Sequence, residues 1–129
     1  MKKLVENQIS YDIRGAALHV HKNLGPGLLE SVYEQALAYE LAKMGYTVMR
    51  QVGVPMKYKN IRFDIGFRLD ILVNDLVIIE IKSVEYLAAV HYKQLQTYLR
   101  LSEKKLGLLI NFNSVRIKDA IERVVNNLF

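Results

Sequence analysis

The segment RLDILVNDLVIIEIKS, residues 68–83, predicts the centre of the fold. Two runs rich in Ile, Leu and Val meet at Asn74-Asp75, and these two residue types favour tight turns because their side chains bond to their own backbone. We therefore expect a β-hairpin. The second run is too apolar for a surface strand, so it should be buried.

Charged residues end this buried strand. Side chains alternate along a strand, so Glu80 and Lys82 lie side by side on one face. A buried charge is costly unless it is paired or binds a metal. A two-residue loop would place Asp70 opposite Ile79, whereas a three-residue loop or a bulge would place it opposite Glu80. We predict the second register, in which the two carboxylates need a cation such as Mg²⁺ or Mn²⁺ between them.

These residues resemble a known group of enzymes. Asp70, followed by Glu80-Ile81-Lys82, is similar to the D…(D/E)xK signature of the PD-(D/E)XK nuclease superfamily. QLQTY at 94–98 is similar to the QxxxY motif of its RecB-like exonuclease branch. GLLESVY at 27–33 resembles the GxxExxY signature that names a small bacterial and archaeal family. The resemblance extends over residues 19–112.

The expected fold is α/β, with a restriction-endonuclease-like α-β-β-β-α-β core in which a mixed central sheet carries helices on both faces. We expect a single domain over residues 1–129. Apolar periodicity predicts helices over 8–23, 28–44, 85–102 and 117–128, and it predicts strands over 46–58, over 106–112 and in both runs of the hairpin.

The resemblance implies a metal site. Asp70 and Glu80 would hold Mg²⁺ or Mn²⁺, with the carbonyl oxygen of Ile81 as a further ligand. Glu30 would either be a further ligand of the metal or form a hydrogen bond with one of its ligands. The alternative for Glu30 is simple stabilisation of the first turn of a helix by its negative charge.

Other residues would act on the substrate. Lys82 would position or deprotonate the attacking water, and Gln94 and Tyr98 would orient the lysine, the water or the scissile phosphate. Gln and Tyr at this spacing are also often just satisfied polar groups at the rim of a helix.

Four more residues are candidates for substrate or metal contacts. Arg68 shares a strand face with Asp70 and could contact a phosphate or form a plain ion pair. The remaining candidates are Tyr33 and His91 for substrate, and His21, whose place in the RecB-like pattern can supply a metal ligand but whose alternative is a capping or solvated role.

Composition narrows the class of protein. The chain has 129 residues, no cysteine and a net charge of +5, so it has neither disulfides nor thiolate ligands and it weakly favours polyanions. Its apolar runs are too short for a membrane span, and we expect a cytoplasmic protein. The expected partner is DNA, bound largely without sequence readout and in single-stranded or structured form, with a homodimer as an option. The rival classes are an inactive binding module and an interaction subunit.

Overall fold

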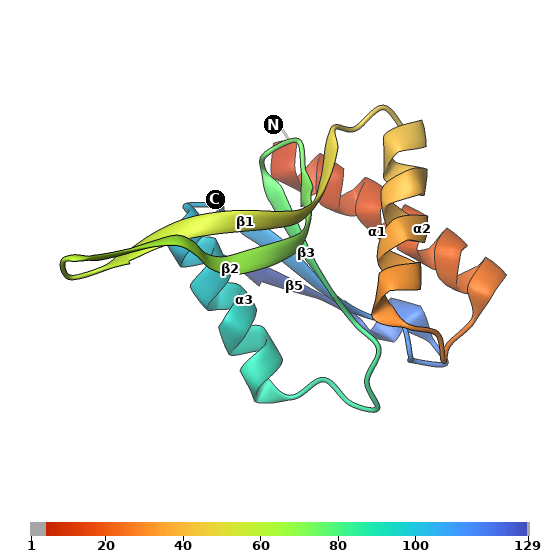
Figure 1. Cartoon of the computed structure of the whole chain (residues 1–129). Coiled ribbons are helices and arrows are strands. Elements are labelled where there is room, and N and C mark those ends of the chain that lie inside the picture. Colours follow the sequence, from red (N-terminus) through yellow and green to blue (C-terminus); the bar gives the residue numbers. More distant parts are fainter. Residues whose placement is uncertain (1–4, 129) are drawn as a thin grey trace.

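A central sheet of five strands organises the computed structural model, which describes residues 5–128 (Figure 1). The strand order is β1-β2-β3-β4-β5, and all neighbours are antiparallel except β3 and β4. The elements along the chain are α1 (Val5–Leu24), α2 (Glu30–Lys43), β1 (Val48–Tyr58), β2 (Ile61–Val73), β3 (Val77–Lys82), α3 (Ala89–Ser102), β4 (Leu106–Asn111), the short 3₁₀ helix η1 (Ile117–Asp119) and β5 (Ile121–Val125).

The helices lie on both faces of the sheet, as predicted. One apolar cluster joins α1 and α2 to β2, β3 and β4, and a second joins α3 to the opposite face (Figure 1). Gly107 of β4 lies directly under α3, because a Cβ at that position would come within 2.8 Å of the Leu95 side chain. In the part of the chain that the structure describes, no helix is long and apolar enough to cross a bilayer.

The central hairpin has the predicted register. Val73 pairs with Val77 and Ile71 pairs with Ile79, which leaves a three-residue loop. Asn74 and Asp75 both adopt positive φ, at 51° and 56°, which are conformations that these two residue types tolerate better than most. The same register places Asp70 across from Glu80.

Two predicted helices need correction. The segment from residue 117 onward is not a helix: after η1 it forms β5, which pairs with β4 through Ile110↔Ile121 and Gly107↔Val124. Its spacing of apolar residues suits a helix, but its β-branched residues suit a strand, and its pairing covers the edge of the buried strand β4. α3 begins at Ala89 rather than at residue 85, because buried Asn111 bonds both backbone groups of Val84 and holds that segment as a loop.

The buried face of α2 is not the one that the spacing of its apolar residues indicates. Leu29, Val32 and Met44, which are apolar, are 73%, 40% and 50% exposed. Glu34 and Ala38 are buried in their place. The helix is therefore rotated so that a carboxylate points inward, which the apolar pattern alone did not indicate.

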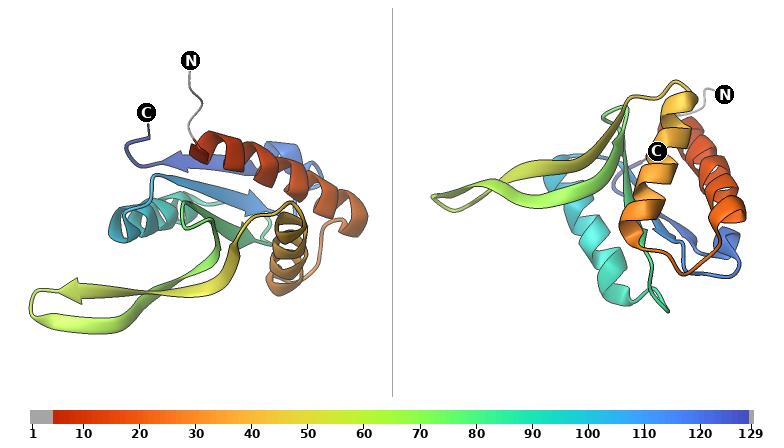
Figure 2. Two further views of the ribbon diagram at one scale, coloured as in Figure 1. Left: turned by 90° about the horizontal axis from the view of Figure 1, so that it is seen from above. Right: turned by 45° about the vertical axis from the view of Figure 1, so that its right-hand side comes forward.

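The β1–β2 hairpin extends well beyond the rest of the sheet (Figures 1 and 2). Its register shifts between Val54, which pairs with Phe67, and Met56, which pairs with Phe63. We call residues 55–66 the arm. A Cβ at Gly66 would come within 2.1 Å of the Met56 side chain, so any larger residue there would have to displace that side chain.

Candidate active site

The candidate site forms where β2 and β3 separate. Their backbone pairing ends at Ile71↔Ile79, although β2 itself continues back to Ile61 in contact with β1. At the next position the Asp70 N–H donates to Glu80 Oε2 at 2.9 Å, and the Ile81 N–H donates to Asp70 Oδ2 at 2.8 Å. Two carboxylates therefore occupy positions that backbone carbonyls fill in a regular ladder. We call this place the fork.

Negative charge accumulates at the fork. Glu80 is 4% exposed, and burial, followed by the charge of Asp70, raises its pKa to about 8. Burial also raises the pKa of Asp70, and Glu34 and Glu30 act in the same direction. The positive charge of Lys82 lowers the pKa of both carboxyl groups without offsetting these effects. The positive charge near the fork is therefore too small to balance the burial and mutual repulsion of the two carboxyl groups.

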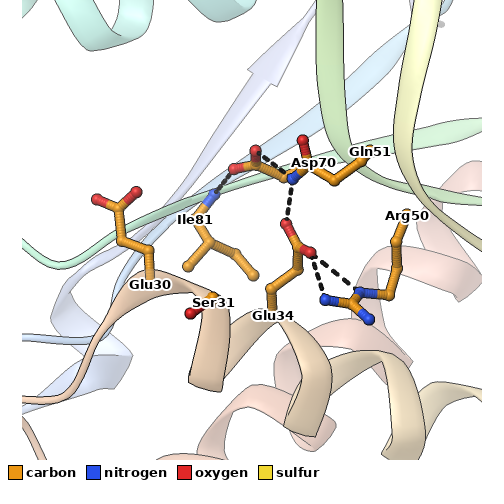
Figure 3. Close-up of a pocket in the computed structure, with 7 residues that line it drawn as sticks. All are labelled: Glu30, Ser31, Glu34, Arg50, Gln51, Asp70 and Ile81. Atoms are coloured by element: carbon orange, nitrogen blue, oxygen red, sulfur yellow. Dashed lines mark hydrogen bonds and ion pairs between the residues drawn. The ribbon is translucent and has the colours of Figure 1, made fainter.

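A pocket of about 400 Å³ opens beside Asp70 on the α2 side of the sheet (Figure 3). Helix α2 supplies one wall and β1 the other, and Gln51 Nε2 lies 3.5 Å from Asp70 Oδ1. Six of the seven residues that line it are polar or charged: Glu30, Ser31, Glu34, Arg50, Gln51 and Asp70, with Ile81 as the seventh.

Glu34 is a site residue that the sequence reasoning missed. It is 5% exposed, and its carboxylate accepts hydrogen bonds from Arg50 at 2.8 and 3.0 Å and from Gln51 Nε2 at 2.7 Å (Figure 3). Gln51 reaches it from a backbone with φ of 50°. Glu34 is four residues after Glu30, on the same helix face, and this spacing was the available signal.

Glu30 lies at the start of α2, beside the end of β3. It lines the same pocket as Asp70, and its Oε2 accepts a hydrogen bond from the Ser83 N–H at 3.1 Å. Ser83 Oγ in turn donates to the Leu28 carbonyl at 2.8 Å. These bonds connect the start of α2 to the end of β3.

Tyr33 is a core residue, so its predicted role in substrate binding is wrong. Its side chain is fully buried and stacks on Phe112 with ring centroids 4.6 Å apart. Its hydroxyl donates to the Gly25 carbonyl at 2.6 Å and accepts from the Leu28 N–H at 3.0 Å. In the GxxExxY segment the tyrosine therefore holds the turn before α2, while the glutamate faces the pocket.

The residues of α3 divide into two groups. Tyr98 is half-buried and stacks on Phe67, and its pKa is raised by burial and by the charges of Glu80 and Asp70, so it lies close to the fork. Gln94 is exposed and outside the pocket lining.

The predicted substrate contacts His91 and Arg68 also lie outside the pocket lining. His91 Nδ1 accepts a hydrogen bond from the Ala88 N–H at 2.9 Å, which gives this residue a structural role at the start of α3. Arg68 is exposed on β2, two residues before Asp70.

His21 has a structural partner. Its Nε2 lies 2.7 Å from the Ser114 carbonyl oxygen, which can only accept, so Nε2 is the protonated nitrogen. The contact joins the end of α1 to the loop after β4, and His21 is not among the residues that line the pocket beside Asp70.

The donor chemistry of the fork fits a hard divalent cation. Within residues 5–128 no group of three or more His, Asp or Glu side chains is gathered to hold a metal by itself. Mg²⁺ does not require such a cage, since it retains several waters and binds through one or two carboxylates plus substrate phosphates. Asp70 and Glu80, whose pKa values are raised, are two such carboxylates.

The chain belongs to the PD-(D/E)XK nuclease superfamily. The model of that family matches residues 7–124, which is nearly the whole chain and includes the fork. No curated protein and no solved structure matches the chain. The mixed sheet, the helices on both faces and the acidic pair at the fork agree with this assignment.

Proposed function

We propose that this protein is a nuclease that uses Mg²⁺ or Mn²⁺ to hydrolyse phosphodiester bonds of DNA, largely without sequence preference. We assign it to the GxxExxY group on the segment 27–33. The observation that supports the proposal most strongly is the fork, where Asp70 and Glu80 face each other on strands that have just parted.

The proposed metal ligands are the carboxylates of Asp70 and Glu80 and the carbonyl oxygen of Ile81, with Glu30 supporting them. When bound, the ion would offset negative charge on the phosphodiester and make water more acidic. Glu30 has the position for its part, since it lines the pocket with Asp70 and accepts from the backbone that follows Lys82.

Lys82 is the proposed group that positions or deprotonates the attacking water. Its positive charge lowers the pKa of both carboxyl groups of the fork, and this effect supports the proposed role. Tyr98 projects from α3, and the charge of Glu80 raises its pKa. We propose that it orients Lys82 or the phosphate. We keep Gln94 as a weaker candidate, because it is exposed on the same helix and a bound substrate could reach it.

The first test combines Mn²⁺ titration calorimetry with cleavage of labelled single- and double-stranded DNA. We expect wild type to bind Mn²⁺ and to cut in its presence. Asp70→Asn with Glu80→Gln should lose both properties, and Lys82→Ala should keep binding but lose cutting. Asp64→Asn, which alters an exposed carboxylate on the arm, is the matched control. Absence of carboxylate-dependent metal binding would reject the proposal.

A second candidate, a nuclease-fold binding module without activity, also has support. Both carboxylates of the fork already accept backbone hydrogen bonds, as a purely structural pair would. However, Asp70 lines an open pocket, which a scaffold does not require. DNA binding without any cleavage, unchanged by Asp70→Asn with Glu80→Gln, would favour this candidate.

A further inference from the structure

Asn111 is a buried polar residue to which the proposed function gives no part. In the portion of the chain that the structure describes, the buried polar or charged residues are Glu34, Glu80 and Asn111. The first two belong to the candidate site. Asn111 is 4% exposed, it ends β4, and it is not among the residues that line the pocket beside Asp70. A buried amide needs hydrogen-bond partners, so the partners of Asn111 indicate what it does.

The side chain of Asn111 bonds both backbone groups of Val84. Its Oδ1 accepts from the Val84 N–H at 3.1 Å, and its Nδ2 donates to the Val84 carbonyl at 2.9 Å. A carboxamide has the same donor and acceptor as a peptide group, so this side chain extends the pairing of β4 beyond its last residue. Oδ1 also accepts from the Asn113 N–H at 3.2 Å. The amide therefore joins the chain after β3 to the chain after β4.

These bonds act where β3 has lost one of its two neighbours. β2 pairs with β3 only as far as Ile79, whereas β3 continues to Lys82. On the other side the pairing extends to Lys82↔Asn111, and the Phe112 N–H donates to the Lys82 carbonyl at 2.9 Å. We call residues 82–84 the exit segment. Within the sheet, the exit segment is held from the β4 side.

The exit segment also contacts the start of α2. The Ser83 N–H donates to Glu30 Oε2 at 3.1 Å, and Ser83 Oγ donates to the Leu28 carbonyl at 2.8 Å. Ser83 therefore lies between Lys82, which β4 holds, and Val84, which Asn111 holds. Without the amide of Asn111, both backbone groups of Val84 would need new partners, and the segment would shift to find them. Such a shift would move the donor that orients Glu30.

We propose that Asn111 is a positioning residue, which holds Val84 and thereby fixes Lys82 and Glu30 in their places at the candidate site. The inference rests on the proposed function, in which Lys82 acts on the attacking water and Glu30 supports the metal ligands. A displacement of about 1 Å in a catalytic group can lower a rate on the order of a hundredfold, so a loose exit segment should reduce turnover. Binding of the substrate, which is spread over many contacts, should change little.

The alternative is that Asn111 only closes the loop between β3 and α3. Loss of the amide would then lower stability, but it would not change the turnover of molecules that remain folded. Separate values of kcat and KM, measured well below the unfolding temperature, distinguish the two roles.

The experiment compares Asn111→Ala with wild type in cleavage of fluorescein-labelled single-stranded DNA at saturating Mn²⁺. The matched control is Asn126→Ala. The Asn126 side chain also donates to a backbone carbonyl, that of Lys104 at 3.0 Å, but it follows β5 beside the opposite end of β4. Circular dichroism checks that both variants are folded.

We expect Asn111→Ala to lower kcat at least about tenfold and to leave KM within about twofold of wild type, because it misplaces catalytic groups without removing substrate contacts. Asn126→Ala should leave both constants close to those of wild type. A folded Asn111→Ala protein with the kcat of the control overturns the inference. So does a loss of activity that lies in KM alone.

Amide hydrogen exchange, followed by NMR in metal-free wild type, tests the same bonds without a variant. After correction for intrinsic rates, we expect the Val84 N–H to exchange at least about a hundredfold more slowly than that of Tyr86, because hydrogen-bonded amides exchange only through local opening. Tyr86 lies in the loop that follows, with its side chain 78% exposed. Equal rates at the two positions would overturn the inference even if Asn111→Ala did not fold.

The results also separate this inference from the proposed function. If wild type never cuts, the nuclease is rejected, and exchange at Val84 still decides whether Asn111 holds the exit segment. If wild type and Asn111→Ala cut equally well, the nuclease is supported and the positioning role of Asn111 is rejected.

Discussion

Asp70 and Glu80 each accept a backbone N–H from the opposite strand, so their carboxylates connect β2 and β3 where the regular pairing ends. Glu34 lies beside them, held by Arg50 and Gln51 of β1. The first two residues can be found from local sequence, because an acidic residue that ends a buried strand is visible in the residue pattern and alternation along two strands of a hairpin limits the choice of partner. Glu34 cannot, because only the packing of α2 against β1 brings it together with Arg50 and Gln51.

Protonation of Glu80 should contribute to stability in the metal-free protein. The pKa of Glu80 is about 8 in the folded state against 4.5 for an ordinary glutamate. Between these pH values the folded protein holds a proton that the unfolded chain has released. The resulting stabilisation is fully present below about pH 4.5 and is lost as pH rises through 8.

The variant Glu80→Gln tests this relation. We expect it to raise the free energy of unfolding at pH 8.5 by on the order of 3 kcal/mol, because it keeps an acceptor for the Asp70 N–H and removes the buried charge. Near pH 5 the gain should largely disappear. Urea denaturation in EDTA at both pH values measures it, with Asp64→Asn as the control. An equal gain at both pH values would contradict the explanation.

Arg50 should stabilise the fold through Glu34. Arg50→Ala leaves a nearly buried carboxylate with Gln51 as its remaining partner, and we expect a loss of roughly 1 to 3 kcal/mol in the free energy of unfolding. Adding Glu34→Gln should recover part of that loss, since the unpaired charge is then gone. A double-mutant cycle by urea denaturation measures the coupling, and Arg62→Ala, an exposed arm residue, is the control. Additive effects would show that the pair is not coupled.

At the scale of elements, helices and strands with strong local signals were predicted correctly, and ambiguous ones were not. The hairpin had a clear turn signal at Asn74-Asp75, and α1 had clear apolar periodicity. The last segment had apolar residues at a spacing that fits a helix, but pairing with β4 determined its structure. Tyr33 illustrates the same limit, since a residue one turn after a site residue can face the core.

Tyr33 should stabilise the turn before α2 and should have no role in catalysis. Tyr33→Phe keeps the stacking on Phe112 and removes the hydroxyl that bonds the Gly25 carbonyl and the Leu28 N–H. We expect a loss of about 1 to 2 kcal/mol by chemical denaturation. Tyr39→Phe is the matched control because Tyr39 is 63% exposed. A Tyr33→Phe protein as stable as the Tyr39→Phe control would show that these bonds add nothing.

At the scale of the whole molecule, the feature that the sequence did not reveal is the arm. The strand pattern of β1 and β2 looks the same whether a third strand covers the ribbon or not. In the sequence, Tyr58, Ile61 and Phe63 look like ordinary apolar strand residues. They are exposed because no third strand or helix covers the ribbon at this place. Long-range arrangement, not local preference, determines this exposure.

The fold should survive removal of the arm. Replacing residues 55–66 with Asn-Gly retains the Val54↔Phe67 pair and provides a favoured hairpin turn. We expect the free energy of unfolding to change by less than about 1 kcal/mol, because an isolated two-stranded ribbon contributes little stability. Thermal and urea denaturation measure the change. Failure of this variant to fold would mean that the arm is part of the folding unit.

β2 runs as one strand from the tip of the arm, through the fork, into the middle of the sheet. Ile61 and Asp70 are nine residues apart along it, so a strand of this length sets a separation of up to about 30 Å between the tip and the acidic pair. That length corresponds to about nine base pairs of duplex at 3.4 Å each. If the tip grips one point of a substrate, the protein acts as a ruler, and the position of the cut is measured from the point of grip rather than read from the bases.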